Sequence, residues 1–360
     1  MTRYDWHALQ PARALSPDDP RYVPRPWGGG DRLAVLVRNG LTPIALTGPL
    51  GSGKTTELRR ALALLGETVH GVEVPADLLV PLDDLSPDVL LWELARYLLD
   101  HVLERDPDLR PSRALVDDIR ASDPRLPRGG GIHRKPLDLV RLVLAEVADL
   151  VDHDRVGLLI DGLDKAQPDR ARAAIRALLP LQHDAELVVV VSPALANGPR
   201  SHEVLAHMRV WWLPSIPADS EEGLRYLRRI VTRRLERRQL PKSLKPVADR
   251  AAAESGGVTR TFLRLVQDAA LYATAEGRVR PTPETLSHAI RDRADAMRRI
   301  LVAGDLEALA NALGTDGLEI PEDRKIRLLA HNALLEYPDG EGSVVRPHPL
   351  LAPLLARRTS

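Results

Sequence analysis

The segment from Gly48 to Thr55 constrains the fold more than any other part of the chain. It reads Gly-Pro-Leu-Gly-Ser-Gly-Lys-Thr, which fits the pattern G-x-x-x-x-G-K-[ST], and it lies between an apolar stretch and a helical pattern that starts at Lys54. Glycines in such a loop let backbone N–H groups converge on phosphate oxygens, and the helix N-terminus adds positive potential. The segment predicts a nucleotide-binding loop between a strand and a helix, and hence an α/β fold.

The residues of this segment, called the phosphate loop below, have separate predicted roles. The Lys54 ammonium is a point charge suited to the β and γ phosphates, and the Thr55 hydroxyl is suited to Mg²⁺. No motif of the kind that marks GTPases is evident, so ATP is the expected nucleotide. The predicted nucleotide-binding residues here are Gly48, Pro49, Leu50, Gly51, Ser52, Gly53, Lys54, Thr55 and Thr56.

Apolar runs of strand length alternate with amphipathic helical patterns up to Pro217. This alternation is typical of a parallel sheet with helices on both faces. The predicted strands are 43–47, 69–74, 156–160, 187–191 and 210–213. The predicted fold class is α/β, a three-layer P-loop core with a five-stranded parallel sheet, followed by a helical lid and a small C-terminal module.

Changes in pattern along the chain predict its division into domains. After Pro217 the patterns are helical, until two short strand patterns flank a tight turn near Pro338 to Gly342. That hairpin is the expected wing of a winged-helix-like module. A stretch rich in Pro, Gly and Arg, 122–136, which includes Gly129 to Gly131, is predicted to be a loop. The predicted parts are an N-terminal extension (1–19), the core (20–217) with a helical insertion at about 85–135, a helical lid (218–300) and the C-terminal module (301–360).

A second motif runs from Gly157 to Asp161, where an apolar strand ends in a carboxylate. An aspartate at a strand end is often only a turn residue. Together with the phosphate loop upstream, Asp161 is instead predicted to orient Mg²⁺, so that Thr55 and Asp161 are the expected metal residues.

The two motifs, Thr47 to Leu58 and Leu159 to Asp164, resemble those of the AAA+ and STAND branches of the P-loop ATPases. The resemblance covers about residues 20–300. It implies an ATPase that uses ATP and Mg²⁺ and assembles as an oligomer, such as a ring. Bacterial proteins of this appearance often act beside a separate effector protein in antiviral defence, and others are origin-recognition-like.

The resemblance also implies further site residues. Ser192, directly after the fourth strand, matches a polar sensor of the γ phosphate, although a Ser-Pro turn gives the same sequence. Arg260 matches a second sensor, with a solvated surface arginine as the alternative. Arg200 and Arg209 lie where the family has an arginine that reaches a neighbouring subunit's nucleotide.

The same resemblance places the adenine pocket just upstream of the first strand. Tyr22, Val23 and Pro24 are the expected residues there, and a turn-forming segment accounts for them equally well.

One departure from the family concerns the residue that activates water. Standard AAA+ sequences have a glutamate directly after the magnesium aspartate, whereas Gly162 follows Asp161 here. Asp164 is the preferred replacement, and Glu73 at the end of the second strand is the alternative. A chain without a working base would be a non-hydrolysing nucleotide switch.

Charge and composition limit the partners. Fifty basic and 50 acidic residues balance, which excludes a uniformly basic nucleic-acid binder but leaves room for local patches. Arginines crowd a predicted lid helix from Arg225 to Arg238, which either binds duplex nucleic acid or is the solvated face of an amphipathic helix. The absence of cysteine excludes thiolate catalysis and disulfides, and no apolar run is long enough for a membrane span, so we expect a cytoplasmic protein.

Three functions therefore stand as hypotheses. The first is an Mg²⁺-dependent ATPase that couples its nucleotide state to oligomer assembly or to regulation of a separate effector. The second is a DNA-remodelling ATPase of the origin-recognition or transposition type. The third is the nucleotide switch that binds ATP without hydrolysing it.

Overall fold

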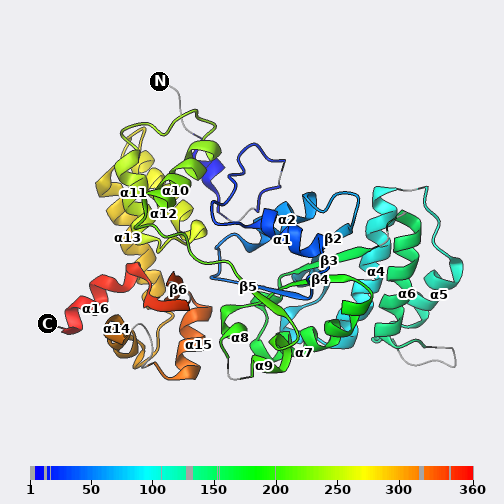
Figure 1. Ribbon diagram of the computed structural model, residues 1–360. Coiled ribbons are helices and arrows are strands. Elements are labelled where there is room, and N and C mark those ends of the chain that lie inside the picture. Colours follow the sequence, from blue (N-terminus) through cyan, green and yellow to red (C-terminus); the bar gives the residue numbers. More distant parts are fainter. Residues whose placement is uncertain are drawn as a thin grey trace. The chain divides into compact units, whose positions relative to one another are not determined.

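The chain forms two compact units in the computed structural model (Figure 1). The structure describes residues 5–11, 14–16, 18–106, 108–126, 133–151, 153, 155–198, 200–315, 320–339 and 342–359. The sheet unit comprises residues 30–47 and 57–212, and the helical unit comprises residues 1–29, 48–56 and 213–360. The Gly129 to Gly131 stretch, predicted to be a loop, lies outside the described residues.

The sheet unit contains a parallel five-stranded sheet with the strand order β2-β3-β4-β1-β5. Each predicted strand is confirmed, with both ends within one residue of the prediction. The strands are β1 (Ile44–Thr47), β2 (His70–Pro75), β3 (Val156–Asp161), β4 (Glu186–Val190) and β5 (Arg209–Trp212). β1 and β3 are buried almost throughout, as parallel strands covered on both faces must be, and this explains their uninterrupted apolar sequences.

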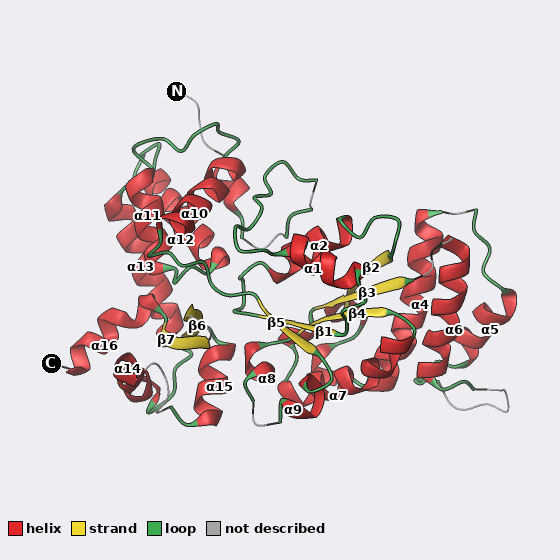
Figure 2. Ribbon diagram, viewed as in Figure 1, coloured by secondary structure: helices red, strands yellow, loops and turns green. Residues whose placement is uncertain are grey.

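Helices lie on both sides of this sheet, with α1 and α2 on one side and α7 on the other (Figure 2). The helix α1 was not predicted. The helices of this unit are α1 (Gly30–Arg38), α3 (Ala76–Leu79), α4 (Pro87–Arg105), α5 (Arg113–Ala121), α6 (Pro136–Val151), α7 (Pro168–Leu178), α8 (Pro193–Ala196) and α9 (His202–Leu205), with 3-10 turns η2 (Leu82–Asp84), η3 (Leu163–Lys165) and η4 (Leu179–His183). The helix α2 (Lys54–Ala63) begins in the phosphate loop.

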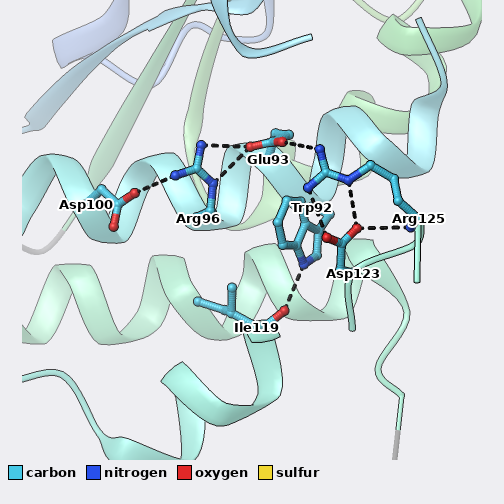
Figure 3. A network of polar contacts seen from close by, with 7 residues as sticks. All are labelled: Trp92, Glu93, Arg96, Asp100, Ile119, Asp123 and Arg125. Atoms are coloured by element: carbon cyan, nitrogen blue, oxygen red, sulfur yellow. Dashed lines mark hydrogen bonds and ion pairs between the residues drawn. The ribbon is translucent and has the colours of Figure 1, made fainter. Parts of the chain in front are cut away.

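Within the predicted insertion, α4 packs on α6, which follows the insertion, and both helices contribute to the hydrophobic core of the sheet unit together with Leu115 and Ile119 of α5. A polar network ties α4 to α5 and to the segment after it (Figure 3). The Trp92 indole donates to the Ile119 carbonyl at 2.8 Å, and the Arg125 guanidinium lies 4.5 Å from the Trp92 ring centroid. Arg125 also binds Glu93 and Asp123, and its hydrogen bonds hold the pKa of Asp123 below its usual range.

The helical unit is built around one hydrophobic core that runs from Leu9 to Leu355. Its elements are η1 (Trp6–Leu9), α10 (Glu221–Arg234), α11 (Lys245–Glu254), α12 (Thr259–Ala275), α13 (Pro283–Arg298), α14 (Asp305–Thr315), α15 (Glu322–Ala330), β6 (Leu334–Asp339), β7 (Gly342–Pro347), η5 (Pro349–Leu351) and α16 (Ala352–Thr359). The antiparallel pair β6 and β7 confirms the predicted hairpin.

The N-terminal segment and the C-terminal hairpin both pack into this core. The Arg234 guanidinium donates to the Gln10 carbonyl at 2.9 Å, and Leu9 of η1 is fully buried. At the other end of the chain, the Tyr337 hydroxyl of β6 donates to the Gly256 carbonyl at 3.0 Å. The predicted lid and C-terminal module thus share a single core with the segment that precedes the sheet unit.

A buried histidine lies in the same unit. The His348 side chain is fully buried, and its Nδ1 accepts a hydrogen bond from the Leu350 N–H at 3.2 Å at the start of η5. Burial, with a smaller contribution from the charge of Arg293, lowers the pKa of His348 to about 3. His348 is therefore neutral in the folded protein throughout the physiological range.

No helix among the described ranges is long and apolar enough to span a membrane.

Candidate nucleotide-binding site

The phosphate loop connects β1 to α2, as predicted, and its glycines have backbone conformations that other residues rarely adopt. Gly51 and Gly53 have φ angles of 87° and 103°. A Cβ atom on Gly51 would lie 2.5 Å from the Cβ of Arg260, so this position also requires glycine for lack of space. The glycines therefore give the loop a tight backbone conformation of the kind that lets N–H groups converge on an anion.

The Lys54 side chain folds over this loop. Its ammonium donates to the Gly48 carbonyl at 2.9 Å and to the Pro49 carbonyl at 3.3 Å, and the residue is only 6% exposed. The Ser52 N–H closes a turn onto the Pro49 carbonyl at 3.1 Å. A positive charge is thus held against the loop at the first residue of α2, where the helix N-terminus adds its own positive potential.

Arg25 supports the phosphate loop through hydrogen bonds, a role that was not predicted. Its guanidinium donates to the Ser52 carbonyl at 3.0 Å and to the Pro214 carbonyl, and the residue is 5% exposed. The Ser52 hydroxyl is also buried and has no hydrogen-bond partner within the described part of the chain. A buried arginine needs acceptors, and Arg25 meets this need by joining the loop to the segment that leads into the lid.

Arg260 lies beside the loop, at the start of α12. Its backbone N–H donates to the Gly51 carbonyl at 3.0 Å. Its side chain is exposed and forms no hydrogen bond or ion pair with any residue that the structure describes. The structure thus brings this predicted sensor arginine next to the phosphate loop, with its guanidinium available.

Asn332 is a further residue at the loop that was not predicted. Its side-chain oxygen accepts from the Leu50 N–H at 3.1 Å, and its side-chain nitrogen donates to the Leu50 carbonyl at 2.7 Å. Asn332 lies between α15 and β6, so the C-terminal hairpin region contacts the phosphate loop directly.

The predicted acidic residues belong to the sheet unit. Asp161 ends β3, and its carboxylate accepts from the N–H of Gly162 at 2.9 Å. Gly162 has a left-handed conformation and starts η3, which contains the half-buried Asp164. Both carboxylates thus lie at the carboxyl end of a central strand, the edge of an open parallel sheet at which ligands bind.

Glu73, the alternative base, is held in an ion pair. The guanidinium of Arg59 on α2 contacts both Glu73 carboxylate oxygens at 2.9 Å. The hydrogen bond with Glu73 raises the pKa of Arg59 against the effect of burial, and the charges of Glu73 and Asp161 add to the increase. Arg59 was not predicted, because a helical arginine four residues after Thr55 resembles any surface arginine in this arginine-rich sequence.

The remaining predicted polar residues, Ser192, Arg200 and Arg209, differ in the hydrogen bonds and ion pairs that they form. Ser192 is buried and caps α8, accepting from the Leu195 N–H at 3.1 Å, so the Ser-Pro turn considered from the sequence is present. Arg200 forms ion pairs with Glu203 and Asp169. Arg209 is exposed at the start of the edge strand β5, and its guanidinium forms no hydrogen bond or ion pair with the described residues.

The residues predicted to pack on the base lie in the helical unit. Val23 is buried in its hydrophobic core, and Tyr22 is half-buried, its N–H bonded to the Asp19 carbonyl at 2.8 Å.

Within the described ranges, no three His, Asp or Glu side chains form a cluster that could hold a metal ion.

Comparisons with known proteins identify the fold of the chain. No protein-family model and no curated protein matches the sequence. Among solved structures, the ORC1 protein of Aeropyrum pernix in complex with DNA matches 99% of this chain and 98% of its own, with a TM-score of 0.50 and 18% identity. The ORC2 protein of Aeropyrum pernix in its ADPNP-ADP complexes matches 100% of both chains, with a TM-score of 0.53 and 14% identity. The chain therefore has the α/β fold of these ORC proteins.

Proposed function

We propose that this chain is an AAA+-type ATPase that binds ATP and Mg²⁺ at the phosphate loop. The observation that carries the proposal is the position of Lys54, whose ammonium is held against the carbonyls of a glycine-rich loop at a helix N-terminus. The loop N–H groups and Lys54 would bind the phosphates, and Arg260 would reach the nucleotide from α12. The hydroxyl of Thr55 and the carboxylate of Asp161 are oxygen donors of the kind Mg²⁺ prefers. The magnesium would neutralise phosphate charge during hydrolysis.

Asp164 is the residue we propose to activate water. Glu73 is less suited to this role, because its carboxylate is already bonded by Arg59 on both oxygens. We instead assign to Glu73 the placement of Arg59 beside Asp161.

Phosphate release from carboxylate variants tests this assignment. Asp164→Asn should lower kcat by about 10²- to 10³-fold with little change in ATP affinity, since a positioned base contributes about 10²- to 10⁴-fold. Glu73→Gln, the matched control, should lower kcat by less than about 10-fold. If Glu73→Gln loses the larger factor, the roles are reversed. If the wild type binds ATP but releases no phosphate, the chain is the non-hydrolysing switch.

Nucleotide state would act through assembly or through a separate effector protein. Of the two arginines considered for contact with a neighbouring subunit, we propose Arg209, because Arg200 is engaged by Glu203. A role in bacterial defence stays a prediction from the sequence resemblance alone.

A second candidate function, binding of duplex DNA, is favoured by an arginine stripe on α10. Arg225, Arg229 and Arg233 lie four residues apart and are all exposed, and this spacing puts them on one face at about 6 Å per step. Arg229 and Arg233 form no hydrogen bond or ion pair with the described residues. The similarity to an ORC1 protein solved with DNA supports the same proposal.

The prediction of one continuous basic helix from Arg225 to Arg238 was wrong in its bounds, because α10 ends at Arg234. Two of its arginines are also structural: Arg228 pairs with Asp249, and Arg234 is buried and bonded to Gln10. The DNA-binding proposal therefore rests on the stripe rather than on the whole run.

The salt dependence of DNA binding tests whether the arginine stripe of α10 binds DNA. The double variant Arg229→Gln/Arg233→Gln should weaken binding to any duplex sequence and flatten the plot of log K against log[salt] by about 1.8, at about 0.9 per lost phosphate contact. Arg298→Gln/Arg299→Gln, which removes two exposed charges elsewhere in the helical unit, should leave the slope unchanged. Equal slopes for the wild type and the stripe variant would refute the proposal.

A further inference from the structure

The contact between Asn332 and the phosphate loop uses the whole side-chain amide. The oxygen accepts from the Leu50 N–H and the nitrogen donates to the Leu50 carbonyl, at 3.1 Å and 2.7 Å. Both peptide groups that flank Leu50 are thereby fixed, in the way that a neighbouring strand fixes a residue of a sheet. An amide is suited to this, because it offers a donor and an acceptor side by side.

The backbone at Asn332 has a conformation that favours this contact. Its φ angle is 56°, in the left-handed region, where asparagine is tolerated better than most residues. Within the described residues, the only other non-glycine residue with a positive φ is Glu236, at 52°. The turn between α15 and β6 thus aims a short amide side chain at the loop.

Two adjacent residues of the loop are held by different parts of the helical unit. The Leu50 carbonyl is bonded by Asn332, and the Gly51 carbonyl by the N–H of Arg260. These two parts are themselves joined, since the Tyr337 hydroxyl of β6 donates to the Gly256 carbonyl just before α12. A shift of the loop would therefore be transmitted through these hydrogen bonds to the C-terminal hairpin.

We propose that Asn332 is a positioning residue of the phosphate loop, through which the C-terminal hairpin and nucleotide binding are coupled. The proposal rests on the proposed function, since it takes the loop to bind nucleotide. By holding the backbone at Leu50, Asn332 preorganises the loop and raises its affinity for nucleotide. Coupling is reciprocal, so nucleotide must in turn stabilise the contact and the hairpin region that provides it.

Affinity for a fluorescent ATP analogue tests the first half of the proposal. Asn332→Gly removes the amide but suits the left-handed backbone, and it should raise the Kd about 10-fold or more, because two hydrogen bonds are lost. Glu236→Gly is the matched control, because it makes the same kind of change at a left-handed position that forms no hydrogen bond or ion pair with the phosphate loop among the described residues. It should leave the Kd unchanged. If Asn332→Gly does not fold, Asn332→Asp serves, since an ionised carboxylate cannot donate to the Leu50 carbonyl.

Amide hydrogen exchange tests the coupling itself. Without nucleotide, the Leu50 amide should exchange faster in Asn332→Gly than in the wild type or Glu236→Gly. With the ATP analogue, exchange around residues 331–336 should slow in the wild type but not in Asn332→Gly, even when nucleotide saturates the loop. A merely structural role would not produce this difference.

The outcomes separate the two proposals. If the wild type binds no nucleotide, the proposed function fails, and the nucleotide-free exchange at Leu50 still decides whether Asn332 holds the loop. If the wild type binds nucleotide but Asn332→Gly has the same Kd and the same exchange at Leu50 and at 331–336, the role of Asn332 is overturned and the proposed function stands.

Discussion

Replacing Lys54 by alanine should lower the affinity for ATP by about 10²-fold or more and should abolish ATP hydrolysis. Lys54 is 6% exposed, and its ammonium is held against the loop carbonyls at the point where α2 begins. Its bonds to phosphate would be charge-assisted, each contributing about 1.5–3 kcal/mol. Loss of two such bonds lowers affinity by at least about 10²-fold, since about 1.4 kcal/mol is a factor of ten.

Titration with a fluorescent ATP analogue and a phosphate-release assay measure these losses. Lys242→Ala removes an exposed lysine of the same unit and should behave as the wild type. Thermal unfolding of both variants without nucleotide separates loss of binding from loss of fold. A Lys54→Ala protein that hydrolyses ATP at the wild-type rate would show that the site is wrongly assigned.

Acidification should destabilise the helical unit through His348. The pKa of this residue is about 3 when folded and about 6.5 when unfolded, so between these values the unfolded chain binds the extra proton. Stability from His348 is therefore fully present above about pH 6.5 and is lost as the pH falls toward 3, by up to about 1.4 kcal/mol per pH unit. At pH 5 the expected loss is about 2 kcal/mol.

Urea unfolding at pH 7, 6 and 5 measures the free energy of unfolding of the wild type and of the variant His348→Asn. His348→Asn keeps an acceptor for the Leu350 N–H but does not titrate, so its free energy of unfolding should fall less steeply with acidification. Its stability at pH 7 will be lower, because a smaller side chain leaves space in the core. The exposed His331→Asn should retain the wild-type pH dependence. Parallel pH profiles for the wild type and His348→Asn would contradict the burial argument.

The parts of the structure that the sequence predicts are those encoded by local patterns. The phosphate loop is a contiguous motif, and the buried strands β1 and β3 are uninterrupted apolar runs, so both could be placed closely. The helix α1 was missed because Gly28 to Gly30 suggests a loop, although Leu33, Ala34 and Val37 are buried at helical spacing. Its first N–H is bonded by the buried Glu57 carboxylate at 2.8 Å, a contact that no local pattern encodes.

The supports of the candidate site could not be predicted, because they come from distant parts of the chain. Arg25 and Asn332 are common polar residues whose importance lies only in the backbone atoms that they bond. The ion pair between Arg59 and Glu73 required knowing that α2 passes beside β2. Sequence patterns therefore supplied the residues that we propose to face the nucleotide, whereas the residues that hold the phosphate loop and its neighbours in place emerged only from the fold.

The bond between Asn332 and Leu50 joins residues that are 282 positions apart. During synthesis, Leu50 leaves the ribosome long before Asn332 is made, so the loop must exist for most of translation without this contact. A nascent chain that stops before the α15–β6 turn would contain the complete nucleotide motif without the amide that holds it. The order of synthesis thus delays the finished loop until the C-terminal hairpin emerges.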